Sequence, residues 1–320
     1  ICSIPMIGVV RAGQLLSRFG DPQGVYEAGT AGWREILSDS VVEYMDRQKK
    51  SGNLEEEYHS LGEKQIGLVL QEEEGFPQKL LEIPDPPYGL FYKGKLPEQK
   101  QPSVAVIGAR ECSEYGRFVA EELGRYLGSQ GIQVISGMAR GIDGISQQAA
   151  LLAGGTSYGV LGCGVDICYP RQNRKLYEEL IQKGGLLSTY APGTKALPAY
   201  FPPRNRIVSG LADALIVIEA RQKSGTLITV DMALEQGKDV YVVPGRITDR
   251  LSDGCNRLLT QGAGVFLSPE SFTEEFLRNW EEKQELSSPD PAQKIRGRRK
   301  SRKRIEKLEE PLRQVYKLLD

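Results

Sequence analysis

Between residues 103 and 267, short apolar runs alternate with longer stretches of mixed polarity. The apolar runs predict strands at 103–108, 133–137, 158–162, 186–190, 214–219, 239–244 and 264–267. The stretches between them predict helices, for instance at 114–130, 144–153, 173–183 and 226–237. Strands that alternate with helices form a mainly parallel sheet with helices on both faces. The predicted fold class is therefore α/β, an extended Rossmann-like, doubly wound sheet that we assign to residues 103–280.

Residues 1–70 are predicted to form a small helical domain. Apolar residues stand at mostly helical spacing at Ile7, Val10, Leu15, Leu16 and Phe19, and Gly20-Asp21-Pro22 ends this helix. The segment resembles a helix–hairpin–helix of the SAM-like kind, whose hairpin offers backbone N–H groups to phosphate. Met6 stands where the first glycine of that hairpin belongs, and only Gly8 remains. This departure favours a structural role.

The segments on either side of the α/β region have a different composition. Prolines in residues 71–102 exclude a long helix, so we expect an extended connector packed along another domain. Residues 281–305 predict a disordered linker, with eight basic residues among the eleven from Lys294 to Arg304. Residues 306–320 place apolar side chains on one helical face with nothing after them to pack on, so we expect the start of a truncated domain.

Composition and charge narrow the class of protein. The 41 basic and 42 acidic residues of the 320 nearly cancel, so only a local concentration of positive charge can attract an anionic polymer. No apolar run approaches the roughly 20 residues that a membrane span needs, and we expect no membrane association. Five scattered cysteines without a C-x-x-C pair predict a reduced, cytoplasmic protein. With one histidine, His59, and no metal-ligand spacing or G-x-S-x-G elbow, we expect neither metal nor catalysis.

Glycines and cations follow the predicted strands. In an open α/β sheet, the loops after parallel strands meet at one edge, where helix N-termini favour anionic ligands. That edge should bring together Arg110, Ser136, Gly137, Arg140, Gly162, Gly164, Arg171, Arg204, Arg206, Ser224, Gly225 and Thr226. The first loop lacks G-x-G-x-x-G and the second strand ends without an acid, so we expect no dinucleotide cofactor. Asp143 and Asp166 are expected to brace these loops by accepting backbone N–H groups.

An aromatic residue accompanies the cations. Phe201 lies in AYFPPRNR, which we interpret as a proline-broken loop just before Arg204 and Arg206. Bases of a single strand stack on such rings, while arginines bind its phosphates. Arg110, on the first strand–helix loop, should bind phosphate beside a helix N-terminus. The alternative is that the aromatic side chains anchor loops to the core.

Six segments stand in order over residues 104–245: VAVIGAR, SGMARGID, GCGVDICYP, FPPRNRIVSGLA, EARQKSGTLIT and VYVVPG. Together they resemble the DprA/Smf family of bacterial DNA-processing proteins. The resemblance implies a homodimeric cytoplasmic protein that binds single-stranded DNA and loads RecA recombinase during natural transformation, with no known enzymatic activity. It also implies a small helical domain in front and a winged helix behind, of which residues 306–320 would be the start.

Individual residues match the family's motifs. The resemblance implies that Arg110 and Arg171 contact the strand, that Phe201 contacts a base, and that Arg204-Asn205-Arg206 belong to the same groove. Two positions depart from the family. Gln147 stands where the family commonly has a histidine, and Pro198 stands where it often has a lysine, for which Lys195 is a possible substitute.

Two alternatives to DNA binding share the same edge. Related Rossmann-like hydrolases of nucleoside monophosphates carry P-G-G-x-G-T-x-x-E, but Ser224-Gly225-Thr226 is followed by Leu227-Ile228-Thr229 and no glutamate. A sensor of a small nucleotide remains compatible with the sequence. For the homodimer, we expect an interface at the end of the α/β domain through Leu258, Leu259 and Val265, which could instead fill the core.

Overall fold

The computed structural model describes residues 4, 7–52 and 54–287. The chain divides into two compact units, Ile1–Thr273 and Glu274–Asp320. Met6 and residues 288–320, with most of the predicted linker and all of the predicted truncated domain, lie outside the described residues. Helix α11 (Pro269–Ser287) begins in the first unit and includes residues 281–287, so the prediction of a linker from 281 onward is wrong for these seven positions.

The N-terminal region is helical. It consists of α1 (Val9–Phe19), α2 (Pro22–Trp33), α3 (Asp39–Ser51) and α4 (Leu54–Glu63). Gly20 ends α1 with a left-handed φ of 90°, and the Asp21 side chain caps α2 by accepting from the Gly24 N–H. Leu15, Val25 and Trp33 are buried together, and the Trp33 indole donates to the Val25 carbonyl at 2.6 Å. Val10, predicted on the apolar face, is 61% exposed.

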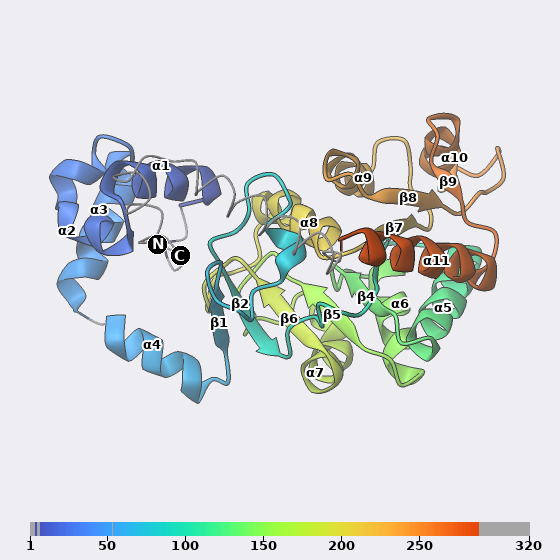
Figure 1. The fold of residues 1–320 in the computed structure, drawn as a ribbon, viewed down its shortest axis with the longest axis horizontal. Helices are drawn as coiled ribbons and strands as arrows, with labels where there is room; N and C mark the ends of the chain where they lie inside the picture. Colours follow the sequence, from blue (N-terminus) through green and yellow to red (C-terminus); the bar gives the residue numbers. More distant parts are fainter. Residues whose placement is uncertain (1–3, 5–6, 53, 288–320) are drawn as a thin grey trace, which may run out of the picture. The chain divides into compact units, whose positions relative to one another are not determined.

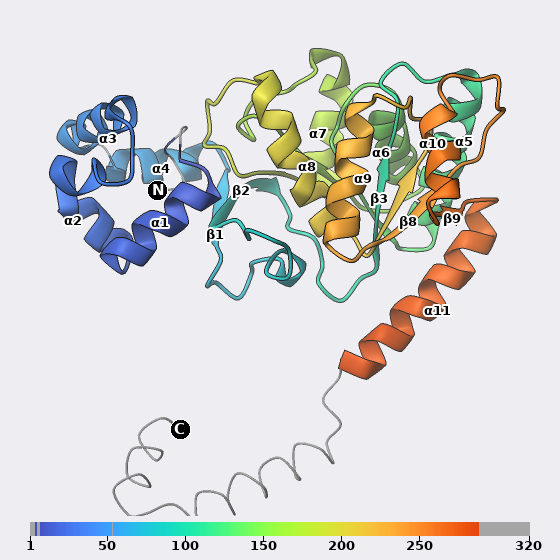
Figure 2. The ribbon, with the colours of Figure 1, turned by 90° about the horizontal axis from the view of Figure 1, so that it is seen from above.

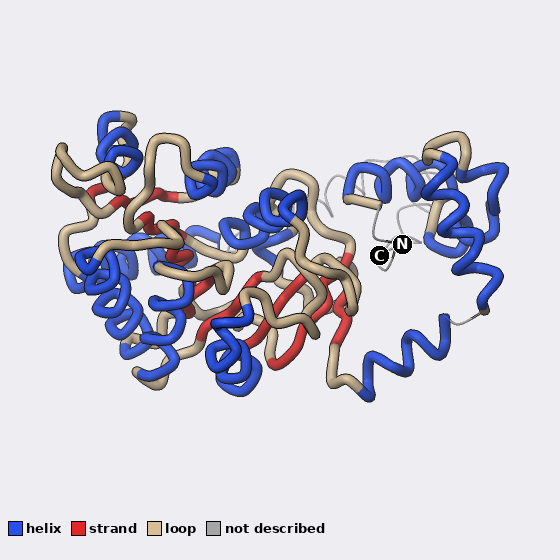
Figure 3. The backbone as a smooth tube through the Cα atoms, turned by 180° about the vertical axis from the view of Figure 1, so that it is seen from behind, coloured by secondary structure: helices blue, strands red, loops and turns tan. Residues whose placement is uncertain are grey.

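A single nine-stranded sheet follows (Figure 3, strands in red). Its strands are β1 (Gly67–Leu70), β2 (Gly89–Gly94), β3 (Ser103–Ile107), β4 (Gln133–Ser136), β5 (Ser157–Val160), β6 (Gly185–Ser188), β7 (Ala214–Val217), β8 (Asp239–Val242) and β9 (Gly264–Val265). The order is β1-β2-β6-β5-β4-β3-β7-β8-β9. Strands β3 to β9 are parallel to one another, and β1 and β2 run antiparallel at one edge. The predicted α/β, Rossmann-like sheet is thus confirmed.

Helices cover both faces of this sheet (Figures 1 and 2). They are α5 (Glu114–Ser129), α6 (Ile142–Leu152), α7 (Arg174–Lys183), α8 (Phe201–Gly210), α9 (Gly225–Glu235) and α10 (Asp253–Thr260), with short 3-10 turns η1 (Gln78–Leu80), η2 (Arg171–Asn173) and η3 (Pro198–Tyr200). One apolar cluster joins the sheet to α8, α9 and α10, and another joins it to α6 and α7. Every residue of β3 and β7 is buried, as expected for strands covered on both sides.

Two glycines allow α5 and α6 to pack closely. A Cβ on Gly124 would clash with the Ser146 carbonyl oxygen, and one on Gly128 would lie 2.5 Å from the Ala150 carbonyl oxygen. Any side chain at these positions would therefore force the helices apart. Their close approach fixes α6, and with it the loop that enters α6 from β4.

The proline-broken loop predicted around Phe201 is wrong, because these residues begin a helix. Helix α8 starts at Phe201, and Pro202 and Pro203 stand in its first turn. Proline is well tolerated there because the N–H groups of a first turn have no partner within the helix. The two prolines therefore start the helix, and the side chains of Arg204 and Asn205 point from its first turns.

The predicted connector is part of the sheet. Strand β2 pairs antiparallel with β6, and η1 carries Lys79 to the opposite edge of the sheet from the strand carboxyl ends. The Lys79 ammonium donates to the Ser103 hydroxyl at 2.8 Å and to the Asp213 carboxylate at 2.7 Å. Asp213 also accepts from the Ser103 backbone N–H at 2.8 Å. Lys79 and Asp213 thus fasten the segment before β3 to the starts of β3 and β7.

This contact predicts an effect on stability. Replacing Lys79 by methionine leaves Asp213 largely buried without its cation, so the free energy of unfolding should fall by about 1.5–3 kcal/mol. The exposed pair of Lys50 and Asp46 on α3 offers a control, and Lys50→Met should change it by no more than about 0.5 kcal/mol. Urea titrations of both variants make the comparison; equal shifts would show that the Lys79 contact adds nothing beyond a surface pair.

Candidate functional site

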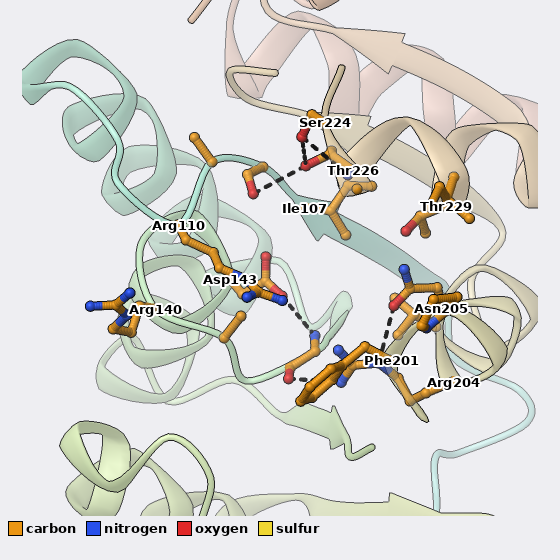
Figure 4. A pocket seen from close by; sticks show the side chains of 18 of the residues that line it. Ile107, Arg110, Arg140, Asp143, Phe201, Arg204, Asn205, Ser224, Thr226 and Thr229 are labelled. Carbon is orange, nitrogen blue, oxygen red and sulfur yellow. Dashed lines mark hydrogen bonds between the residues drawn. The ribbon is translucent and has the colours of Figure 1, made fainter. Parts of the chain in front are cut away.

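A cavity of about 650 Å³ lies at the carboxyl ends of the parallel strands. The loops after β3, β4 and β7 and the first turns of α8 and α9 form its walls (Figure 4). Strand β3 is the point at which the strand order reverses, since β4 follows on one side of it and β7 on the other. Ligands of open α/β sheets bind in the crevice at such a switch point. The cavity therefore occupies the position that the topology favours for a binding site.

Phe201 lies on the wall of this cavity among cations and a second ring. The guanidinium carbons of Arg110 and Arg204 are 5.7 Å and 5.8 Å from the centre of the Phe201 ring. The Tyr169 ring lies 5.6 Å away, tilted by 31°. Gly162, after β5, leaves room for the Phe201 ring, since a Cβ there would lie 2.9 Å from a ring carbon. The structure thus brings together Arg110 and Phe201, which are 91 positions apart in sequence.

The guanidinium of Arg204 is buried and held in place by hydrogen bonds to the protein. Its side chain is only 6% exposed, and its guanidinium donates to the carbonyl oxygens of Gly137 and Val160. Its Nε donates to the Asn205 side-chain oxygen at 3.1 Å. Burial lowers the pKa of Arg204, and the negative charge of Asp143 opposes that shift. Arg204 therefore links the ends of β4 and β5 to α8.

Asp143 and Asp166 brace loops as predicted. Asp143 accepts from the Gly137 N–H at 3.1 Å, and both oxygens of Asp166 accept from the Gly193 N–H at 2.9 and 3.0 Å. Burial raises the pKa of the Asp143 carboxyl, while the charge of Arg204 opposes the rise. A Cβ on Gly137 would lie 2.8 Å from both the Arg204 guanidinium and the Asp143 carboxylate. The glycine therefore permits these two buried charges to approach each other.

The helix N-termini at this edge are not equivalent. At α5, the N–H and hydroxyl of Ser113 both donate to Glu219, so a protein carboxylate already occupies that position. At α6, Asp143 stands in the first turn. The first turn of α9 has no acidic residue, Gly225 is exposed, and the basic side chains of Arg221 and Lys223 precede it. The helix beside Arg110 therefore has a carboxylate at its start, and of α5, α6 and α9 only α9 has a first turn without an acid, which suits it to an anion.

Most of the predicted binding residues line the cavity. They are Arg110, Gly137, Arg140, Phe201, Arg204, Asn205, Ser224, Gly225 and Thr226. Arg221, Lys223 and Thr229 also line it and were not predicted. Arg221 and Lys223 come shortly before Ser224 in the same loop, and this position in the sequence could have predicted that they line the cavity.

Six predicted residues lie outside this cavity, and one of them, Gly162, lies against the Phe201 ring. Ser136 is fully buried and donates to the Val106 carbonyl at 2.6 Å, and the buried Gly164 donates its N–H to Thr194. Arg206 is directed away from the cavity and donates to the Asp85 carbonyl. Arg171 and Lys195 are exposed elsewhere on the surface. Arg171 and Lys195 could contact a ligand only if that ligand extends beyond the cavity.

The residues proposed for a dimer interface differ in their exposure to solvent. Leu258 is 8% exposed and belongs to the core, and Leu259 packs against that core. Val265, on the edge strand β9, is 51% exposed. Of the three, only Val265 is available to a second chain without rearrangement, and the dimer stays a prediction.

The described part of the chain offers neither a metal site nor a membrane span. There, His, Cys, Asp and Glu side chains form no group of three or more that could hold a metal ion. Within the same residues, no helix combines the length and apolar character needed to cross a membrane.

Comparison with known proteins identifies relatives of this fold and sequence. Residues 67–277 match the family described as DNA recombination-mediator protein A. DNA processing protein DprA of Streptococcus pneumoniae is 43% identical over 201 residues, 63% of this chain and 71% of that protein. The Bacillus subtilis DprA is 39% identical over 201 residues, covering 62% of this chain and 68% of the relative. Protein Smf of Escherichia coli is 38% identical over 208 residues, 65% and 56% of the two chains.

Solved structures agree with this assignment. The crystal structure of the Streptococcus pneumoniae DprA superposes with a TM-score of 0.73 at 33% identity, covering 85% of this chain and 94% of that one. DNA processing protein A of Helicobacter pylori, described for its single-stranded DNA binding mode, superposes with a TM-score of 0.61 at 30% identity, covering 67% and 97%. The chain belongs to the DprA/Smf family of DNA-processing proteins.

Proposed function

We propose that this chain binds single-stranded DNA in the cavity at the carboxyl edge of its sheet and catalyses no reaction there. The observation that carries the proposal is the placement of Phe201 on the cavity wall, with the Arg110 guanidinium 5.7 Å from its ring. An aromatic face beside an exposed cation suits a ligand whose flat bases and phosphates alternate. Arg140, also exposed in the cavity, adds a second cation of this kind.

The cavity offers separate surfaces for the two parts of a nucleotide. Phe201 and Tyr169 form an aromatic surface on one side, and the N-terminus of α9 with Ser224 and Thr226 lies on another (Figure 4). Stacking contributes about 1–3 kcal/mol per base and does not depend on base identity. Phosphate contacts add affinity without reading sequence. The bound strand should therefore be recognised as single-stranded, with little sequence preference.

Family membership supports the wider role. The Helicobacter pylori relative is described as binding single-stranded DNA, and this chain matches the family over 67–277. We accordingly propose that the protein acts in the cytoplasm as a homodimer, protects incoming DNA and loads RecA recombinase onto it during natural transformation. Within this proposal, the cavity holds the strand and another surface meets RecA.

A binding experiment separates this function from its alternatives. Fluorescence anisotropy should show that a dT oligomer binds more tightly than a duplex of the same length, and that mononucleotides compete weakly. The logarithm of the affinity should fall linearly with the logarithm of salt concentration. Tight mononucleotide binding would favour a nucleotide sensor, nucleoside monophosphate cleavage would favour the hydrolase, and a preference for duplex would contradict the proposal.

Arg110 and Phe201 should contribute by different physics. Arg110→Ala removes a phosphate contact, so the slope of log affinity against log salt should become shallower by about 0.7 for single-stranded DNA. Phe201→Ala removes a stacking surface and should weaken binding by roughly 1–3 kcal/mol with the slope nearly unchanged. Paired salt titrations of the two variants, with thermal melts to show that both are folded, measure the difference.

The opposite outcome for Phe201 has a clear meaning. If Phe201→Ala sharply lowers the melting temperature while folded protein keeps its affinity, the ring is an anchor for α8 rather than a stacking surface. The aromatic part of the proposed site would then be wrong.

Arg204 should behave differently from Arg110. Arg204→Met removes the hydrogen bonds to the Gly137 and Val160 carbonyls and leaves the buried Asp143 without a nearby cation, so the free energy of unfolding should fall by about 3–5 kcal/mol. Arg110→Met changes an exposed residue, so its stability should stay within about 0.5 kcal/mol of the unchanged chain. Chemical denaturation compares them. An Arg204→Met protein of normal stability that no longer binds DNA would show that Arg204 contacts the strand directly.

A further inference from the structure

Side chains hold five backbone polar groups of residues 137–139 in the loop between β4 and α6. For Gly137, the N–H donates to Asp143 at 3.1 Å and the carbonyl accepts from Arg204 at 2.8 Å. The carbonyls of Met138 and Ala139 both accept from the Asn173 amide at 3.0 Å. A loop bonded in this way has its conformation fixed before any ligand arrives.

Met138 is the conformationally demanding residue of this loop. Its φ is 52°, in the left-handed region that side chains other than glycine seldom adopt, and its side chain is fully buried. Such a conformation persists only where its surroundings impose it. The contacts around Met138 therefore decide the path of the loop.

Gln147 makes the contact to the Met138 N–H. Its Oε1 accepts from that N–H at 3.1 Å, while its Nε2 donates to the Ser157 hydroxyl at 3.1 Å and to the Tyr158 carbonyl at 3.0 Å. The side chain is fully buried and leaves neither amide atom unused. Gln147 thus ties the left-handed residue to β5.

The same loop places two exposed cations. Arg140 belongs to this loop and lines the cavity. Gly141, with a φ of 73°, lies against the first loop, since a Cβ there would clash with the Ala109 carbonyl oxygen and stand 2.6 Å from that of Arg110. The Ile142 N–H also donates to the Ala109 carbonyl at 3.2 Å. A change in the path of the loop would therefore move Arg140 and the support of Arg110 together.

We propose that Gln147 is a positioning residue for the strand-binding cavity, acting through Met138 on the placement of Arg110 and Arg140. This inference rests on the proposed function of that cavity. Gln147 touches no ligand itself; its amide supplies the acceptor and the donors that hold the loop between two strands. At this position a neutral histidine would also offer one acceptor and one donor.

The chain contains a matched control. Gln133 is also fully buried, and its amide makes three hydrogen bonds to backbone atoms of residues 98 and 101. It stands at the start of β4, at the opposite end of the strand from the cavity. Gln147→Leu and Gln133→Leu therefore remove the same number of amide hydrogen bonds from equally buried positions, and both should lower the melting temperature.

The readout that separates the two roles is the salt dependence of dT-oligomer binding by folded protein. Gln147→Leu should make the log–log slope shallower, by about 0.7 for each phosphate that a displaced arginine no longer neutralises. Gln133→Leu should keep the slope of the unchanged chain, because a smaller folded population lowers the active fraction without altering how each folded molecule binds. Gln147→His should keep most of the slope. Adding Arg140→Ala should weaken binding less in the Gln147→Leu protein than in the unchanged chain.

Two results would overturn the inference while leaving the proposed function intact. One is an unchanged slope in Gln147→Leu, and the other is an equal change of slope in both leucine variants, in each case with the unchanged chain binding the oligomer normally. Failure of the unchanged chain to bind the oligomer would instead contradict the proposed function. If Gln147→Leu does not fold, Gln147→Met provides the same test, because its side chain has a similar length but lacks the amide's donors and its carbonyl acceptor.

Discussion

The burial of the Arg204 guanidinium is the constraint on which the binding edge depends. A guanidinium loses much of its hydration when buried, and it is tolerated only when its donors are used and a negative charge is near. Here the carbonyl oxygens of Gly137 and Val160 accept from it, and Asp143 lies near it at the place where a Gly137 side chain would stand. Satisfying this one cation therefore joins the ends of β4 and β5 to α8. The same helix begins with Phe201, so the position of the ring that we propose for base stacking follows from the buried charge.

Buried and exposed side chains have different roles in the cavity around Arg204. Arg204 is buried in the interior, whereas Arg110 and Arg140 are exposed and line the cavity. The helix N-termini show the same division, because Glu219 accepts from the N-cap of α5 and Asp143 stands in the first turn of α6, while α9 has no acid in its first turn. The charged residues that stabilise the fold are thus different from those that are available to a ligand. If the cavity binds a strand as we propose, its loops need no reorganisation, and less free energy is lost on ordering them.

The sequence predicted those features that follow from local pattern and from βα alternation. Apolar runs predicted the strands β3 and β7. The alternation of strands and helices predicted that Arg110 and Phe201 lie at the same edge of the sheet, although they are far apart in sequence. The start of α8 was missed because two prolines were interpreted as breakers, when a first turn accepts them. The strand β2 was missed because its pairing with β6 is a long-range contact. The burial of Arg204 and the contact of Glu219 with Ser113, the N-cap of α5, depend on partners distant in sequence, and no local pattern encodes them.

A crystal structure of the chain with a dT oligomer tests the central claim most directly, namely that the carboxyl edge is a preformed site for single-stranded DNA. The account predicts a base against the Phe201 ring, phosphates near Arg110 and the first turn of α9, and a loop at 137–140 that keeps its hydrogen bonds to Asp143, Gln147 and Arg204. A strand bound away from this cavity would contradict the assignment of the site. A strand in the cavity with those hydrogen bonds broken would contradict the claim that the site is preformed.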